Sequence, residues 1–293
     1  MELTSDKSIE KEMKAKLLEM LAWFHDFCVK NGIRYFVIAG TMLGAARHGG
    51  FIPWDDDIDV GVPRADYERL AALMGEKPDK RYILETPHSP AKEFVFPFSK
   101  LYDTATTLKE SAKTDIVRGI YIDVFPLDGI GNTLEEARQN YNKTDRLFSL
   151  YMSRVVAVRK GRKPFKNAAA ILIQAVPGFI INNKRLQLKV DEACREHDYD
   201  GCAYAGSLLS GWRFRHVMEK RIFGTPTPYK FEDITAFGVE DCDAYLTHLY
   251  GDWRTLPPED KRGSHHLYVE CDLNKPYLRL NNKREPSEDG SRR

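Results

Sequence analysis

Three features are missing from this 293-residue sequence: a paired-cysteine motif, a long apolar run and an excess of charge of one sign. The five cysteines are odd in number, widely spaced and without a C-x-x-C pair, which argues against a disulfide framework or a cysteine zinc site. The 44 basic and 43 acidic residues leave a formal net charge of +1, so no global field favours nucleic acid. We therefore expect a cytoplasmic protein that does not bind nucleic acid.

The N-terminus and the longest apolar run exclude further classes of protein. Residues 1–16 are charged where a signal peptide would be apolar. The interrupted run Ala168–Ile181 is too short to span a bilayer, which needs about twenty residues. A basic segment, Arg159–Lys166, precedes it, so 159–181 could rest on the anionic inner face of the plasma membrane. The simpler interpretation is a core helix that follows a solvated loop.

One stretch, Tyr35–Val62, organises the chain. Its apolar start predicts a buried strand over Ile33–Ala39, and a Gly40-Thr41 turn follows. Thr41 is expected to cap a short helix that Gly49-Gly50 ends. The stretch closes in an acidic run, which a protein interior tolerates only beside a balancing cation.

The acidic run predicts a metal site. Residues Trp54–Val62 alternate acidic and apolar side chains as a strand does, so Asp57 and Asp59 should share a face. Asp123 is the lone carboxylate of a second predicted strand, and together the three suit Mg²⁺ or Mn²⁺ with open positions for phosphate. Asp123 could also orient or deprotonate an attacking hydroxyl. Asp55 and Asp56 are then expected to fix the loop, and a calcium-stabilised or merely solvated loop is the alternative interpretation.

The turn and helix before the acidic run supply candidate phosphate contacts. Gly40 lets backbone approach a phosphate, Thr41 can donate its hydroxyl, and the helix directs its positive end toward an anion. Arg47 and His48 could contact a phosphate or the leaving group. Gly40-Thr41 could equally be an ordinary turn, and His48 is more often structural than catalytic.

Other candidates lie near the acidic run or far from it. Trp54 could stack on a base or a choline-like cation, or form a wall of the core. Lys100, a lone cation in an apolar strand, could contact a phosphate or snorkel to the surface. His265-His266 could be a ligand pair, although adjacent histidines point apart on regular structure.

Periodicity outlines the remaining elements. An amphipathic helix is predicted over Ser8–Lys30, with Asn31-Gly32 at its end, and a second one begins at Pro63. Thr133 and Glu136 resemble a capping box. Strands are predicted at 82–85, 94–102, 105–109 and 120–125, the last closed by Pro126, and helices at 168–181, 186–197, 212–220 and 239–250.

Three segments carry a family resemblance. AGTMLGAARHGGFIPWDDDIDVGVPRADYERL, YIDVFPLDG from Tyr121 and YLTHLYGDWRTLPPEDKRGSHH from Tyr245 resemble the LicD family of phosphocholine transferases. The resemblance implies an α/β (α+β) fold, a nucleotidyltransferase-like mixed sheet flanked by helices, with a helical C-terminal half. Together with the periodicity, it divides the chain into residues 1–31, a helix on the core, 32–130, the catalytic core, and 131–271, a mainly helical acceptor side. The polar and charged composition of 272–293 predicts a disordered tail.

The resemblance also implies a reaction. CDP-choline would donate phosphocholine to a hydroxyl of a lipid-linked cell-surface glycan, a teichoic acid or lipopolysaccharide precursor, with release of CMP. Asp57, Asp59 and Asp123 match the family's metal-binding and catalytic positions. Related fukutin-related proteins use another CDP-alcohol, so ethanolamine, glycerol or ribitol stay open as the alcohol. A true nucleotidyltransferase and a non-catalytic nucleotide-binding scaffold are the rival interpretations.

Overall fold

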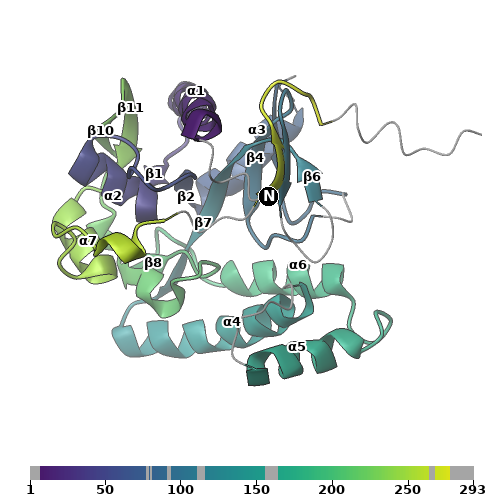
Figure 1. Ribbon diagram of the computed structural model, residues 1–293. Coiled ribbons are helices and arrows are strands. Elements are labelled where there is room, and N and C mark those ends of the chain that lie inside the picture. The colour runs from purple at the N-terminus through teal and green to yellow at the C-terminus, as the bar shows by residue number, and fades with distance from the viewer. Residues whose placement is uncertain are drawn as a thin grey trace, which may run out of the picture.

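A mixed sheet of seven strands forms the centre of the molecule (Figure 1). The structure is a computed structural model that describes residues 7–76, 79, 81–90, 94–110, 116–155, 164–263 and 268–277. The strands follow the order β1-β2-β7-β4-β3, and β8 and β9 continue from β7. β2 and β7 run parallel, whereas the other neighbours are antiparallel. Their bounds are β1 Phe36–Val37, β2 Asp59–Pro63, β3 Tyr82–Glu85, β4 Ser99–Asp103, β7 Tyr121–Gly131, β8 Tyr204–Gly206 and β9 Val217–Glu219.

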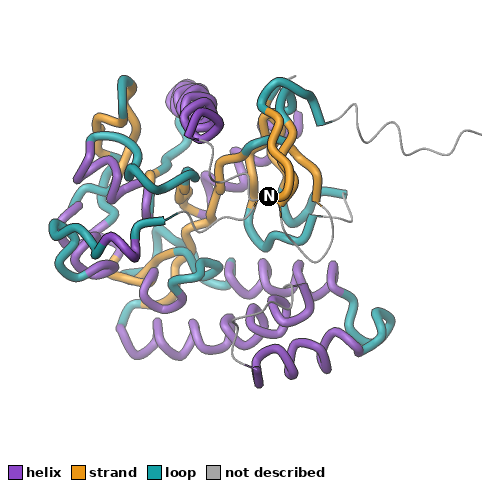
Figure 2. Tube along the Cα trace, viewed as in Figure 1, coloured by secondary structure: helices purple, strands orange, loops and turns teal. Residues whose placement is uncertain are grey.

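Helices cover this sheet from several sides. Figure 2 shows α1 above the strands and the α4, α5 and α6 helices as a layer below them. α2 and α7 pack together beside the sheet, next to a β10–β11 hairpin. The bounds are α1 Lys7–Asn31, α2 Ala39–His48, α3 Arg64–Glu76, α4 Leu134–Val155, α5 Pro164–Ala175, α6 Asn183–Cys194 and α7 Cys242–Tyr250. The mixed sheet flanked by helices is the fold class that the sequence predicted.

Smaller elements complete the chain. β10 and β11 form an antiparallel hairpin, and β12-β5-β6 form a separate three-stranded sheet. Residues 131–271 therefore hold helices, as expected, and also five strands that periodicity did not predict. The bounds are β5 Thr107–Glu110, β6 Ile116–Arg118, β10 Thr227–Phe231, β11 Ile234–Gly238 and β12 Tyr268–Asp272, with 3₁₀ turns η2 Arg213–His216, η3 Lys220–Ile222 and η4 Glu259–Lys261.

Several local predictions are confirmed. α1 buries Leu17, Leu21 and Phe24 at helical spacing, and it ends where Gly32 takes a φ of 61°. The Thr133 hydroxyl accepts the Glu136 backbone amide at 3.2 Å, while the Glu136 carboxylate accepts the Thr133 amide at 3.2 Å. This is the predicted capping box, and it starts α4 one residue later.

Other predictions about the first half are wrong in detail. α2 begins at Ala39 after Ile38, which provides no capping side chain, so Thr41 lies within the helix and does not cap it. β2 begins only at Asp59, so the acidic run before it is irregular and not a strand. β7 continues past Pro126 to Gly131. Pro126 lies between the parts of β7 that pair with β4 and β8, where a missing amide hydrogen is tolerated.

Two predictions about the second half are also wrong. Residues 212–220 form η2 and then β9, because Val217 and Met218 are buried by pairing with β8 and no helix forms. The apolar run 168–181 is not a core helix: Leu172 is 71% exposed and Phe179 89% exposed. The predicted disordered tail begins too early, because Leu273 and Tyr277 are buried. Its residues after Tyr277 lie outside the described residues, as do the His265-His266 pair and most of the basic segment Arg159–Lys166.

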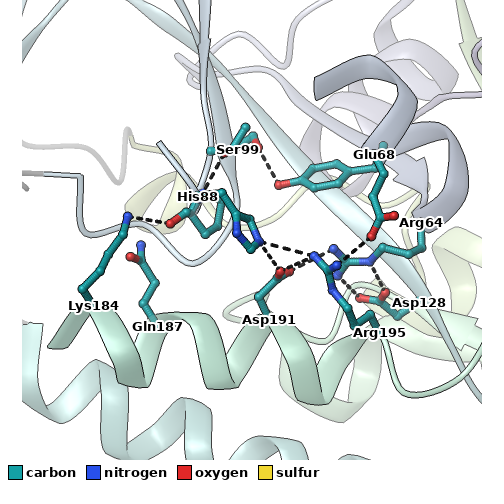
Figure 3. A network of polar contacts seen from close by, with 12 residues as sticks. Arg64, Glu68, His88, Ser99, Asp128, Lys184, Gln187, Asp191 and Arg195 are labelled. Atoms are coloured by element: carbon teal, nitrogen blue, oxygen red, sulfur yellow. Dashed lines mark hydrogen bonds and ion pairs between the residues drawn. The ribbon is translucent and has the colours of Figure 1, made fainter. Parts of the chain in front are cut away.

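A buried ionic network fastens the helical layer to the two parallel strands (Figure 3). Arg64 follows β2 directly, and its guanidinium donates to both oxygens of Asp128 on β7 at 2.6 and 3.0 Å. It also donates to Asp191 on α6 at 2.9 Å. His88 and Arg195 contact the second oxygen of Asp191. Because the three central side chains are almost fully buried, each charge depends on the others for compensation.

The two carboxyl groups respond differently to this environment. Burial raises the pKa of Asp128 and outweighs the opposing effect of Arg64. Burial also acts to raise the pKa of Asp191, but Arg64, the hydrogen bond to His88 and the Arg195 charge together lower it below its ordinary value. Asp191 therefore carries the better-compensated charge of the pair.

Removing the cation of this network should strongly destabilise the fold. We expect Arg64→Met to lower the free energy of unfolding by about 3 to 5 kcal/mol, because it leaves the buried Asp128 carboxylate without its cation and removes one of the cations that compensate Asp191. Urea unfolding followed by circular dichroism measures this change. Arg69→Met on the same helix is the matched control: its side chain is 56% exposed, so its loss should cost at most about 1 kcal/mol. Equal losses in the two variants would contradict the assignment.

Candidate active site

The parallel pairing of β2 with β7 places two carboxylates side by side. Asp59 lies directly opposite Asp123 in the register of these strands. Lys100 on β4 lies opposite Asp123 on the other side. Because opposed residues of neighbouring strands project to the same face of a sheet, the three side chains form a row across β2, β7 and β4. Residues far apart in the sequence thus meet at one point.

Lys100 is a buried counter-charge at the end of this row. Its ammonium lies 3.0 Å from the Asp123 carboxylate, and its side chain is 2% exposed. The same nitrogen lies over the rings of Tyr121 at 3.2 Å and Phe96 at 4.1 Å from their centroids. Such a geometry combines an ion pair with cation–π contacts. The interpretation of Lys100 as a snorkelling surface lysine is therefore wrong.

Four carboxylates share one cavity of about 920 Å³: Asp55, Asp57, Asp59 and Asp123. Burial raises the pKa of Asp59 well above its ordinary value, and the negative charges of Asp57, Asp123 and Asp55 raise it further, while Lys100 opposes the shift. The cavity therefore contains an acidic cluster that one lysine only partly offsets. A cation entering this cavity would be attracted strongly.

Two distant hydroxyl groups fix the backbone at the base of the cluster. The Thr41 hydroxyl accepts the Asp59 amide at 2.8 Å. The Tyr245 hydroxyl on α7 accepts the Ala39 amide at 3.0 Å, where Ala39 has a positive φ of 47°. Strain of this kind persists only when surrounding contacts hold it. Thr41 was predicted from the sequence to contact phosphate. In the structure it lies below the cavity wall and positions Asp59.

The first turn of α2 borders the cavity. Ala39, Gly40 and Leu43 line it. A Cβ on Gly40 would lie 2.7 Å from a side-chain oxygen of Asp55, so a larger residue here would displace that carboxylate from its place beside the helix. The positive end of the helix dipole therefore faces the same cavity as the carboxylates.

The other predicted side chains have separate places. Arg47 lines the cavity and donates to the Trp253 carbonyl at 2.9 Å, and Trp54 lines it beneath the Arg262 guanidinium at 5.4 Å. His48 is not among the lining residues. It contacts Arg47 at 3.0 Å, and burial and the Arg47 charge lower its pKa. The structure thus brings Asp57, Asp59, Asp123, Gly40, Arg47 and Trp54 together around the cavity and places Thr41, Lys100 and His48 behind them.

Sequence reasoning missed the far wall of the cavity. Asp55, which the alternation argument set aside, lines it because the acidic run is irregular and does not alternate like a strand. Ser210, Trp212, His216 and Tyr250 come from the second half of the chain. Burial raises the pKa of Tyr250 well above its ordinary value, and Tyr245 and the acidic cluster raise it further. No spacing pattern in the sequence marks these residues, because they meet only through tertiary packing.

The donor chemistry of the cluster suits Mg²⁺ or Mn²⁺. Across the described residues, no three or more His, Cys, Asp or Glu side chains stand together as a ready metal-binding group. Mg²⁺ at phosphoryl-transfer sites is commonly held by one or two carboxylates together with substrate phosphates. Carboxylates on two adjacent strands, with a helix N-terminus nearby for phosphate, match that arrangement.

Fold and site together define a phosphotransferase enzyme built on a nucleotidyltransferase-like sheet. Residues 32–152 match the profile of the LicD/FKTN/FKRP nucleotidyltransferase domain. The matched part holds the acidic run and YIDVFPLDG, which confirms the resemblance seen in the sequence.

Relatives of known name agree with this assignment. The chain is 26% identical to the lipopolysaccharide cholinephosphotransferase LicD of Haemophilus influenzae over 263 residues, which is 88% of this chain and 96% of that protein. It is 48% identical to the human ribitol 5-phosphate transferase FKRP over 44 residues, 15% of this chain and 9% of that protein. A third relative is mannosyltransferase regulator 4 of Saccharomyces cerevisiae, 26% identical over 48% of this chain and 12% of that protein.

The buried histidine of the far wall makes a pH-dependent contribution to stability. Burial lowers the pKa of His216 to about 3, with a smaller effect from His248. Between pH 6.5 and 3 the unfolded chain therefore binds a proton that the folded chain does not, so stability falls as the pH drops. We expect this group to cost about 2 kcal/mol of unfolding free energy between pH 7 and pH 5.

Urea unfolding at pH 7, 6 and 5 measures this slope. His216→Gln should lose the contribution, so its unfolding free energy changes less with pH than that of the parent protein. Lys230→Gln, at an exposed position on β10, should keep the parent slope. A parent slope in His216→Gln would show that His216 titrates normally.

Proposed function

We propose that this enzyme transfers phosphocholine from CDP-choline to a hydroxyl of a cell-surface glycan, a teichoic acid or lipopolysaccharide precursor, and releases CMP. The observation that carries the proposal is the opposition of Asp59 and Asp123 in one cavity with Asp55 and Asp57. The choice of phosphocholine rests on the likeness to the Haemophilus cholinephosphotransferase, which extends over nearly the whole of both chains.

The cavity offers separate surfaces to the two halves of the donor. The start of α2 and the Arg47 guanidinium suit the diphosphate, because amide dipoles and a fixed cation both favour negative charge. Trp54 and Trp253 provide aromatic faces for the cytosine base or for the quaternary ammonium group. A cavity of about 920 Å³ is in the size range of small-molecule sites.

The proposed reaction is an in-line displacement at the β-phosphorus. The acceptor oxygen forms the new bond to this phosphorus, the bond to the bridging oxygen breaks, and CMP leaves with the electron pair. The Asp123 carboxylate, which forms an ion pair with Lys100 at 3.0 Å, orients the acceptor hydroxyl and takes its proton. Asp57, Asp59 and Asp123 would hold Mg²⁺ or Mn²⁺. When bound, this metal ion would neutralise negative charge on the diphosphate.

The alcohol carried by the donor has alternatives. The human relative FKRP is named as a ribitol 5-phosphate transferase, so CDP-ribitol, CDP-glycerol and CDP-ethanolamine are the competing donors. If the nucleotide itself were transferred, the acceptor would gain the mass of CMP and not that of phosphocholine. A scaffold without activity would release no CMP from any of these CDP-alcohols.

Removing the acidic pair should abolish the reaction. We expect the double variant Asp57→Asn with Asp59→Asn to lose at least about a hundredfold in CMP release, because two of the carboxylates that would hold a metal ion beside the diphosphate are gone. The measurement follows CMP from each CDP-alcohol with Mg²⁺ and a glycan acceptor, and mass spectrometry identifies the group transferred.

Asp233→Asn is the matched control, since Asp233 is exposed at the turn of the β10–β11 hairpin, outside the cavity lining. It should keep the parent rate. Unchanged CMP release in the double variant would overturn the assignment of the metal and catalytic residues.

We also propose a peripheral membrane contact through 159–181, which would bring the cavity to a lipid-linked acceptor. In the part of the chain that the structure describes, no helix has the length and apolar character to cross a bilayer. Exposed apolar side chains gather on α5 and the turn after it: Ile171, Leu172, Phe179 and Ile180. The five cations of Arg159–Lys166 precede them in the sequence, and this composition suits an anionic lipid surface.

Liposome flotation tests this contact. The parent protein should float with vesicles that contain anionic lipid and remain in solution with neutral ones. The double variant Leu172→Ser with Phe179→Ser should lose about tenfold or more in bound fraction, since it removes apolar side chains from the interface. Val29→Ser with Val269→Ser, at exposed apolar positions elsewhere, is the matched control and should bind as the parent does. Failure of the parent to float would exclude the contact.

A further inference from the structure

Two buried polar side chains stand in the far wall of the cavity without a hydrogen-bond partner among the described residues. Neither ring nitrogen of His216 has a hydrogen-bond partner among these residues, and the hydroxyl of Ser210 has none either. His216 is 3% exposed and Ser210 4% exposed, yet both line the cavity that contains the acidic cluster. Buried polar groups are nearly always paired in folded proteins, so two such groups in one wall call for an explanation.

The fold could have filled these positions with apolar side chains at no cost in hydrogen bonding. Leu208 and Leu209, in the same segment between β8 and β9, are fully buried and apolar. A buried polar group without a partner destabilises the folded state. The choice of histidine and serine beside the cavity is therefore explained by a ligand that completes their hydrogen bonds.

The chemistry of His216 limits what that ligand can be. Burial lowers its pKa to about 3, so the ring is neutral at physiological pH and offers one donor and one acceptor. Ser210 likewise both donates and accepts. A phosphate group would instead be drawn to the fixed cations of the cavity, Arg47 and Lys261. A sugar hydroxyl, which donates and accepts at once, matches the neutral pair.

An aromatic side chain beside this pair supports the same ligand. Trp212, between Ser210 and His216 in the sequence, lines the cavity and packs edge-to-face on Tyr250 with ring centroids 5.0 Å apart. Tyr250 holds the indole in place, and an indole face offers an apolar platform to the C–H face of a pyranose ring. Hydroxyl partners next to an aromatic platform are the two components that sugar recognition requires.

We propose that His216 and Ser210, beside Trp212, bind hydroxyl groups of the glycan acceptor and so determine acceptor specificity. The inference rests on the proposed function, since it assigns the acceptor to one wall of that cavity and the donor to the other. His216 does not take part in bond making: it holds the acceptor through hydrogen bonds while the acidic cluster acts on the reacting hydroxyl.

Kinetics with two replacements of His216 test the proposal. His216→Phe removes both nitrogens, whereas His216→Gln keeps a donor and an acceptor. With CDP-choline, Mg²⁺ and a panel of methyl hexosides and N-acetylhexosaminides, we expect His216→Phe to lower kcat/KM for the preferred glycoside at least about tenfold. The loss in glycoside use should exceed any change in the KM for CDP-choline or in the slow release of CMP to water. His216→Gln should recover most of the loss, and Ser210→Ala should weaken glycoside use as well.

Stability provides a second readout. Because His216→Phe removes unpaired polar atoms, its melting temperature should equal or exceed that of the parent, so lost glycoside use cannot be assigned to unfolding. His248→Gln, on the exposed side of α7, should match the parent in every assay. Unchanged kcat/KM for glycosides in His216→Phe, or equal losses in His216→Phe and His216→Gln, would overturn the proposal.

A binding measurement separates this inference from the proposed function. Saturation-transfer NMR detects methyl glycosides on the full chain without any turnover. If the parent releases no CMP from any CDP-alcohol but binds a glycoside that His216→Phe does not bind, the proposed reaction fails and the glycoside site stands. If the parent releases CMP and His216→Phe binds and uses glycosides as well as the parent, the site fails and the reaction stands.

Discussion

The structure depends on one arrangement: carboxylates held together on two parallel strands against their own repulsion. Asp59 and Asp123 face each other in register, and Asp55 and Asp57 add charge from the loop before β2. Lys100 offsets part of this charge from behind. Like charges gathered in a partly buried cavity raise the free energy of the folded state. The rest of the fold must supply the stability that this cluster removes.

Part of that stability comes from contacts at the two ends of β2. The Thr41 hydroxyl holds the amide at the start of β2. At the other end Arg64, directly after β2, is bound to Asp128 of β7 and to Asp191 of the helical layer. Thr41 therefore holds β2 alone, whereas the Arg64 network joins β2 to β7, and the register that opposes Asp59 to Asp123 cannot slip without breaking this buried network.

The local features of the fold could be read from the sequence, because their causes are local. Helical periodicity marked α1, Gly32 marked its end and the Thr133 capping box marked α4. The carboxylates that form the cluster stood out because charge beside apolar strand residues is rare. The alternation argument nevertheless gave the wrong local structure for Asp57, since the acidic run is irregular, and it set Asp55 aside although Asp55 lines the cavity.

What could not be predicted depends on partners far apart in the sequence. β9 is a strand because β8 offers it an edge, and the β10–β11 hairpin turns at Glu232 without the glycine or asparagine that usually marks such a turn. The Arg64 network and the far wall of the cavity unite residues more than a hundred positions apart. Such contacts produce no periodic pattern in a single sequence.

The Tyr245 hydroxyl that accepts the Ala39 amide has a consequence for how the protein is made. The ribosome synthesises the acidic run early and α7 more than 180 residues later. The nascent chain therefore contains the acidic run long before it contains the α7 residues that line the cavity. During this interval the turn at Ala39 lacks the hydroxyl that steadies its positive φ. The wall of the cavity that α7 provides can therefore form only after α7 has been synthesised.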